Sequence, residues 1–323
     1  MSALPFDDAD LESRLAWIFG SHRSGSTWLL RLLADPLLLD QRSARDPLGF
    51  SVPDEAPGAA DVLPVNEFHL ANHLSPATGP PAEIRPGAYM PTTLDTFLAE
   101  RGSYLFARSF ADVWRPEARR LALVRLNALV ERAGERLRVD SPTIVIKEVN
   151  GSHAAGLVMS LFPRSRLIFL ARDGRDVVDS LLHGYQPGGW LGRAVGRTVE
   201  GREQRLKLVG EQARRWTAEM GVVAGAFETR PAELRVKVRY EDLLADTEGG
   251  LAGLFAFLGL PRDRERIAAT VAAHSFDRLP RGLRGPRRTF RAATPGLWRE
   301  NLSREELELA EAIMGPTLRR LGY

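Results

Sequence analysis

The chain has 323 residues, of which 44% are hydrophobic and 26% charged, with a net charge of +3 and no cysteine. This composition is that of an ordinary globular protein, and it excludes a disulfide framework, a thiolate metal site and a cysteine nucleophile. Arginine supplies most of the basic residues, because lysine occurs only at positions 147, 207 and 237. A GC-rich bacterial genome accounts for this bias, so we infer no nucleic-acid binding from it.

The chain carries no sequence signal for a membrane or for export. No apolar run approaches the roughly 20 residues of a membrane span. Residues 1–14 are an acidic, polar lead-in without the basic and apolar segments of a signal peptide. We therefore expect a cytoplasmic protein with no transmembrane segment.

A phosphate-loop pattern follows the first predicted strand, which covers residues 15–20. Gly20 ends this strand, and a short polar loop leads through Gly25 into a predicted helix over 26–34. The N–H groups at the start of such a helix carry partial positive charge and favour an anion. The spacing follows G-x-x-x-x-G-K-[ST] except for the lysine, where Ser26 stands instead.

The missing lysine separates two classes of ligand. Arg23 is the only cation inside the loop. A nucleoside triphosphate is usually neutralised by magnesium, a loop lysine and a carboxylate together. The loop with Ser26 therefore suits a ligand with less charge at this point, such as one 5′-phosphate that carries one sulfate.

Continuous apolar strands alternate with helical patterns along the rest of the chain. After the first helix, strands are predicted at 62–66, 143–149, 166–173 and from 234, and helices at 94–101, 116–134, 157–161, 174–185, 203–226, 248–258 and from a capping box at Ser303 to the end. This alternation predicts an α/β fold with a central parallel β-sheet flanked by helices on both faces. Ligands of such sheets bind beyond the carboxyl ends of the strands.

A second motif follows the strand predicted at 166–173. Arg172 ends this strand, and Ser180 lies eight residues later on the following helix. Taken with the loop at residues 23–28, this motif resembles the paired signatures of the sulfotransferase superfamily, whose donor is 3′-phosphoadenosine-5′-phosphosulfate (PAPS). The resemblance implies a P-loop-like fold and a PAPS-dependent sulfotransferase that leaves PAP as product.

The resemblance also implies the donor-binding residues. The first loop would bind the 5′-phosphosulfate through Arg23, Ser24, Gly25, Ser26 and Thr27, and Arg172 and Ser180 would bind the 3′-phosphate. Trp28 would stack on the adenine, which Tyr240 would help to hold. Arg291 would reach the 3′-phosphate, although the Lys-Gly that usually follows it is Ala292-Ala293 here.

The general base is not where many family members have it. Cytosolic small-molecule sulfotransferases use the histidine of a Lys-x-His, but this strand reads Lys147-Glu148-Val149. Lys147 would stabilise the leaving phosphate. Three candidates for the base remain, in order of preference Glu67, Glu148 and His69.

The resemblance implies one sulfotransferase domain over 1–323, with insertions at 40–91 and 183–202 that form an acceptor pocket and lid. The expected partner is a small-molecule, glycan or lipid alcohol, and no metal is required. A homodimer is compatible with the sequence. Two alternatives stay open, a phosphate-loop small-molecule kinase and a non-catalytic nucleotide-binding protein.

Overall fold

The computed structural model describes residues 8–34, 61–66, 68, 70, 106–134, 137, 139–278, 285, 288 and 292–323. Its strands are β1 (Leu15–Gly20), β2 (Val62–Asn66), β3 (Thr143–Lys147), β4 (Arg166–Ala171) and β5 (Arg235–Arg239). Its α-helices are α1 (Asp8–Ser13), α2 (Ser26–Ala34), α5 (Ala111–Ala133), α6 (Ala155–Leu161), α7 (Gly174–Tyr185), α8 (Trp190–Val195), α9 (Gly201–Glu228), α10 (Tyr240–Ala245), α11 (Thr247–Leu258), α12 (Arg264–Ala273), α13 (Trp298–Asn301) and α14 (Arg304–Leu321).

The strands form one five-stranded sheet in the order β2-β3-β1-β4-β5, and every neighbouring pair is parallel. The chain leaves β1 toward the β3 side of the sheet and leaves β4 toward the β5 side. The strand order therefore reverses between β1 and β4, which is where open α/β sheets form a ligand-binding crevice. The two predicted motifs directly follow these two strands.

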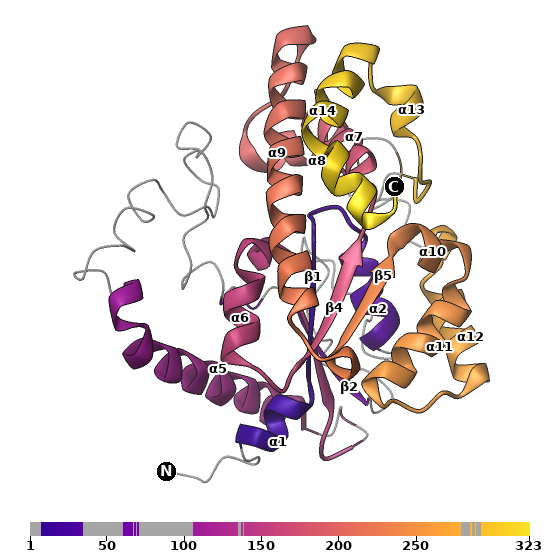
Figure 1. Cartoon of the computed structure of the whole chain (residues 1–323). Helices are drawn as coiled ribbons and strands as arrows, with labels where there is room; N and C mark the ends of the chain where they lie inside the picture. The colour runs from indigo at the N-terminus through magenta and orange to yellow at the C-terminus, as the bar shows by residue number, and fades with distance from the viewer. Residues whose placement is uncertain are drawn as a thin grey trace.

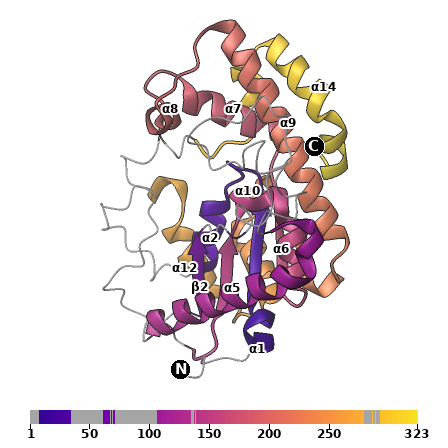
Figure 2. The same cartoon turned by 90° about the vertical axis from the view of Figure 1, so that its left-hand side faces the viewer.

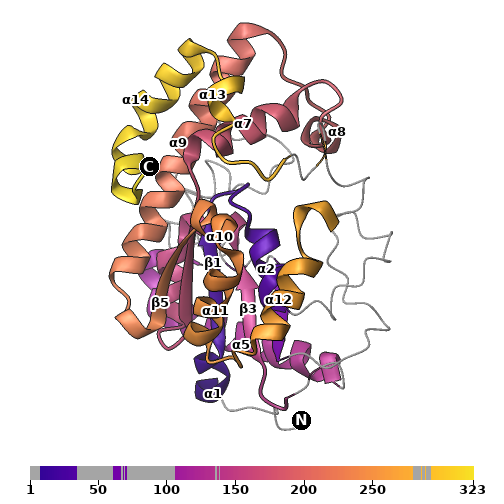
Figure 3. The same cartoon turned by 90° about the vertical axis from the view of Figure 1, so that its right-hand side faces the viewer.

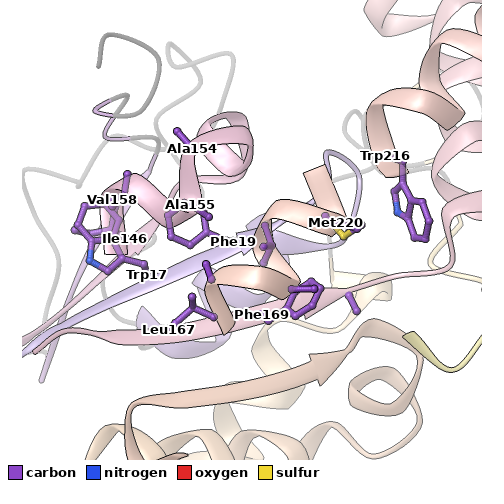
Figure 4. Close-up of a cluster of buried hydrophobic side chains, with 14 of the residues drawn as sticks. Trp17, Phe19, Ile146, Ala154, Ala155, Val158, Leu167, Phe169, Trp216 and Met220 are labelled. Carbon is purple, nitrogen blue, oxygen red and sulfur yellow. The ribbon is translucent and has the colours of Figure 1, made fainter. Parts of the chain in front are cut away.

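Each face of the sheet has its own hydrophobic core, because side chains alternate between the faces along a strand. Trp17 and Phe19 of β1 point to the face that α6 and α9 cover, where Figure 4 shows Trp17 near Ile146 and Phe19 near Met220. Ala16 and Ile18 point to the other face and pack with side chains of α2 and α11. Figures 1 and 3 show α9 and α14 on one side of the sheet and α11 and α12 on the other. The predicted parallel sheet with helices on both faces is confirmed.

The predicted elements that fall on described residues lie within five residues of the observed ones, and α1, α8, α12 and α13 were not predicted. Asp8–Ser13 forms α1 inside the polar lead-in, and Leu11 is fully buried there. Helix α8 lies inside the glycine-rich stretch 183–202, and α12 follows α11. The helix predicted at 94–101 and the insertion at 40–91, apart from β2 and residues 61, 68 and 70, lie outside the described residues.

The last helix begins as its capping box predicts. The hydroxyl of Ser303 accepts from the backbone N–H of Glu306, whose carboxylate accepts from the N–H of Ser303. Helix α14 then packs against α9 and α7. Figure 2 shows α7 and α8 beyond the end of the sheet at which α2 begins, so these helices stand over the crevice.

Candidate functional site

The loop from β1 to α2 is held in a single tight conformation. The N–H of Ser24 donates to the carbonyl of Ser21, and Arg23 has a φ of 65°, in the region that disfavours side chains. The hydroxyl of Ser152 accepts from the N–H of Gly20 at 3.1 Å and donates to the carbonyl of Gly20 at 2.6 Å. The sequence pattern contains no sign of Ser152, because it comes from a segment 132 residues away.

The N-terminus of α2 is directed at the crevice, as the phosphate-loop pattern predicts. The helical hydrogen bonds begin with Leu29 N donating to the carbonyl of Gly25, so the N–H groups of Ser26, Thr27 and Trp28 precede that ladder. Such groups carry the positive end of the helix dipole. The side chain of Ser26 is buried, and Thr27 and Trp28 are half-buried.

The two motifs meet through their arginines. Arg23 donates from Nε to the hydroxyl of Ser180 at 3.0 Å, although 157 positions separate them. Arg172 donates from Nη1 to the backbone carbonyl of Arg23 at 2.6 Å. Two guanidinium groups and one serine hydroxyl therefore converge at the switch point between β1 and β4, and this concentration of positive charge favours an anionic ligand.

Aromatic rings line the α2 side of the same crevice. The guanidinium of Arg172 lies over the ring of Tyr240 at 4.5 Å from its centroid, a cation–π arrangement. Trp28 meets Tyr240 edge-on, with 5.9 Å between ring centroids, and donates from Nε1 to the carbonyl of His274. Burial raises the pKa of Tyr240, while the Arg172 charge opposes that shift. Tyr240 therefore stays neutral at ordinary pH.

Lys147 lies at the carboxyl end of β3, between Ile18 of β1 and Asn66 of β2 in register. Its side chain is buried, and Glu148 after it is fully buried. The N–H of Glu148 donates to the carbonyl of Ile18, which holds this strand end against β1. Glu67 and His69, the other two candidates for the base, lie outside the described residues.

Helix α7 carries two buried carboxylates that the sequence motif did not single out. Asp176 accepts from the N–H of Gly296 at 2.8 Å, and Asp179 accepts from Nδ2 of Asn301 at 3.2 Å. Burial raises the pKa of Asp176, and the hydrogen bond from Gly296 and the charge of Arg172 oppose this rise. These contacts dock the segment 292–301 onto α7. Arg291, the sequence-predicted residue of this segment, lies outside the described residues.

The turn after β4 is tied to α10, the helix that follows β5, by the carboxylate of Glu241. Glu241 accepts from the N–H of Asp173 at 3.0 Å and from the hydroxyl of Tyr323 at 2.9 Å. Asp173 in turn caps α7 by accepting from the N–H of Arg175. The backbone directly after Arg172 is thus fixed by the hydrogen bond from Asp173 to Glu241 and by the cap of α7.

The described part of the chain contains no group of three or more His, Cys, Asp or Glu side chains arranged to hold a metal ion. None of its helices is long and apolar enough to cross a membrane.

A model of the sulfotransferase family matches residues 16–264, which include both motifs and all of the five strands except Leu15. This chain belongs to the sulfotransferase family. The membership confirms the resemblance drawn from the loop and from the Arg172–Ser180 pair, and with it the class of PAPS-dependent sulfotransferases. No curated protein sequence matches the chain significantly.

Solved structures of sulfotransferases are similar to the chain over nearly its whole length. A mouse sulfotransferase complexed with PAP matches with a TM-score of 0.51 at 11% identity, over 94% of this chain and 84% of that one. A sulfotransferase from Mycobacterium avium gives a TM-score of 0.49 at 13% identity, over 95% and 76% of the two chains. The likeness to the mouse structure shows that the two proteins share a fold, which is the P-loop-like sheet predicted from the sequence.

Proposed function

We propose that this sulfotransferase moves the sulfuryl group of PAPS to a hydroxyl of a small-molecule, glycan or lipid acceptor, with a carboxylate as general base. The observation that carries the proposal is the contact between Arg23 of the first loop and Ser180 of the second motif, with Arg172 bonded to the carbonyl of Arg23. A nucleotide with an anionic group on both the 5′ and the 3′ oxygen of its ribose would be bound by both motifs at once.

The residues at the crevice fit such a donor. Two arginines and the N-terminus of α2 are available to bind anions. The rings of Trp28 and Tyr240 lie beside each other and can contact an adenine. The buried hydroxyl of Ser24 has no hydrogen-bond partner within the described ranges, so it is available to bond a ligand. When bound, PAPS supplies an activated sulfuryl group whose leaving group is a phosphate.

The protein's own contribution is positioning and charge stabilisation, as in phosphoryl transfer. We assign Arg23 and the N–H groups of Ser26 and Thr27 to the 5′-phosphosulfate, and Arg172, Ser180 and Arg291 to the 3′-phosphate. The first group lies at the β1 end and the described members of the second at the β4 end, which are neighbouring strands in the sheet. Charge-assisted bonds of this kind contribute about 1.5–3 kcal/mol each.

We further propose Glu67 as the base that accepts the acceptor's proton, with Lys147 as the cation at the leaving oxygen. Asn66, the residue before Glu67, is in register with Lys147 at the carboxyl ends of β2 and β3. Glu148 is fully buried, so it is less suited to meet an incoming hydroxyl. His69 is the third candidate.

Calorimetric titration with PAP and with ATP–magnesium tests the donor assignment. We expect micromolar PAP binding by the wild type and its loss in Arg172→Ala, with Arg304→Ala as a control for an exposed arginine on α14. ATP–magnesium binding without PAP binding would overturn the proposal in favour of a phosphate-loop kinase.

The base assignment needs its own experiment. We expect Glu67→Gln to abolish sulfuryl transfer in an assay of PAP release with a panel of alcohols, while PAP binding survives. Retained turnover in Glu67→Gln would move the role to Glu148 or His69, which Glu148→Gln and His69→Gln would then separate. A protein in which all three substitutions leave turnover unchanged uses no carboxylate or imidazole from this set.

A further inference from the structure

A histidine of the first loop is joined to the long helix α9 by a small, partly buried charge network. Nε2 of His22 lies 3.1 Å from Nη2 of Arg215, and Nδ1 lies 3.8 Å from a carboxylate oxygen of Glu219. Arg215 donates from Nε to Glu219 at 2.8 Å, one helical turn along α9. The network spans 193 positions of sequence. The donor assignments made above do not use any of these three residues.

The chemistry of arginine decides which nitrogen of His22 carries the proton. A guanidinium has only donors, so it cannot accept a hydrogen bond from the imidazole. Nε2 of His22 must therefore be the acceptor of the bond from Arg215, and the ring proton sits on Nδ1, toward Glu219. The contact therefore ties His22 to Arg215 through Nε2.

Glu219 keeps that cation in place. Burial by itself would raise the pKa of Glu219, but Arg215 and His22 lower it to about 2. Glu219 is therefore ionised at every working pH, and Arg215 stays bound between the carboxylate and the imidazole. Helix α9 has 28 residues and packs against α7, α14, β1 and β4, so it is a rigid base for the arginine.

The residue after His22 is the one that needs support. Arg23 has a φ of 65°, and a side chain in this left-handed region costs roughly 1–2 kcal/mol. Such a conformation persists only where the surroundings hold it from several directions. Arg172 donates a hydrogen bond to the carbonyl of Arg23, and the hydroxyl of Ser180 accepts one from its side chain. The hydrogen bond from Ser24 to Ser21 closes the turn that contains Arg23. The bond from Arg215 to His22 is a further support, on the preceding residue.

We propose that His22 is a positioning residue for donor binding: by accepting from Arg215, it anchors the loop to α9 and keeps Arg23 in its left-handed conformation, facing Ser180. This inference rests on the proposed role of Arg23 and Arg172 in binding the donor. It assigns to His22 no contact with the donor and no proton transfer.

The matched pair His22→Gln and His22→Asn tests the geometry. The amide oxygen of glutamine can take the place of Nε2 and accept from Arg215, whereas the amide of asparagine takes the place of Nδ1 and is too short to do so. With PAP as the probe, we expect His22→Gln to bind within about twofold of wild type. We expect His22→Asn and His22→Ala to bind about tenfold more weakly, the loss of one hydrogen bond to a charged group.

A double-mutant cycle separates positioning from a general loss of stability. On an Arg23→Ala background, His22→Ala should weaken PAP binding no further, because its effect passes through Arg23. Arg215→Ala should reproduce His22→Ala, whereas Arg304→Ala should bind PAP like wild type. Arg304 is the control because it pairs with Glu308 at the same i,i+4 spacing on an exposed helix face.

Three results would overturn the inference: wild-type PAP binding by His22→Ala, equal weakening by the Gln and Asn variants, or an undiminished effect of His22→Ala on the Arg23→Ala background. If His22→Ala does not fold, the comparison of the Gln and Asn variants decides the question. Arg172→Ala keeps the proposed function separate: unchanged PAP binding in that variant refutes the donor assignment itself, whatever the His22 variants do.

Discussion

Gly25 is the position at which a single methyl group should do most damage to the proposed donor site. It has a φ of 87°, and a Cβ atom built there would lie 2.5 Å from Cδ2 and 2.6 Å from Cε2 of Tyr240. The ring cannot simply turn away, because Arg172 covers one face and Trp28 meets it edge-on. Gly25→Ala therefore combines backbone strain with a collision against a braced ring.

Both contributions can be given a magnitude. The left-handed backbone costs an alanine roughly 1–2 kcal/mol, and forcing an extra carbon into a packed site costs about 1–3 kcal/mol. We expect Gly25→Ala to lower the free energy of unfolding by about 2–5 kcal/mol in urea titrations, or, where the loop shifts to relieve the contact, to lower PAP affinity by the equivalent amount in calorimetry.

The control is Gly253→Ala on α11. A Cβ atom at Gly253 meets nothing within 4 Å, and its φ is ordinary. Alanine favours a helix over glycine by about 1 kcal/mol, so this variant should be more stable than wild type and bind PAP unchanged. The reasoning about Gly25 is wrong if Gly25→Ala differs from wild type by less than 0.5 kcal/mol (about the error of such measurements) in both assays.

Two further predictions concern the supports of the same loop. Glu219 has a folded pKa of about 2 against an ordinary 4.5, so its stabilisation is complete above pH 4.5 and is lost as the pH falls toward 2, by about 3 kcal/mol in total. Urea titrations of Glu219→Gln should show a flatter acid limb over that range, and an unchanged slope would contradict the cause assigned to the shift. Ser152→Ala leaves the buried N–H of Gly20 without its acceptor and should cost about 1–3 kcal/mol of unfolding free energy. A Ser152→Ala protein as stable as wild type would mean that Gly20 finds another partner.

The sequence predicted secondary structure well where an element depends on residues that are close to one another in the chain. The helix 26–34 and the cap at Ser303 appear in the structure where the sequence predicts them, because a capping box and a strand-loop-helix turn depend on neighbouring residues. Helix α1 was not predicted, because its sequence is acidic and polar apart from Leu11. Leu11 is buried by contacts with the core, whose residues are distant in sequence.

The candidate site was predictable only as two separate motifs. Arg23 and Arg172 could be recognised because their motifs resemble the sulfotransferase signatures and each motif lies where a predicted strand passes into a helix. The roles assigned to Glu67, His69 and Arg291 stay predictions, since these residues lie outside the described ones. The contacts of Asp176 had no signal, because a carboxylate on a helix is equally common on a solvated face.

The sequence by itself determined the parallel sheet through its hydrophobic periodicity, and it indicated the family and the residues of both motifs through their resemblance to the sulfotransferase signatures. Only the tertiary structure decided that β1 and β4 are neighbours, which brings Arg23 to Ser180 across 157 positions. It also decided that His22 meets Arg215 across 193 positions. Contacts at such separations depend on strand order and helix packing, and neither leaves a local pattern in the chain.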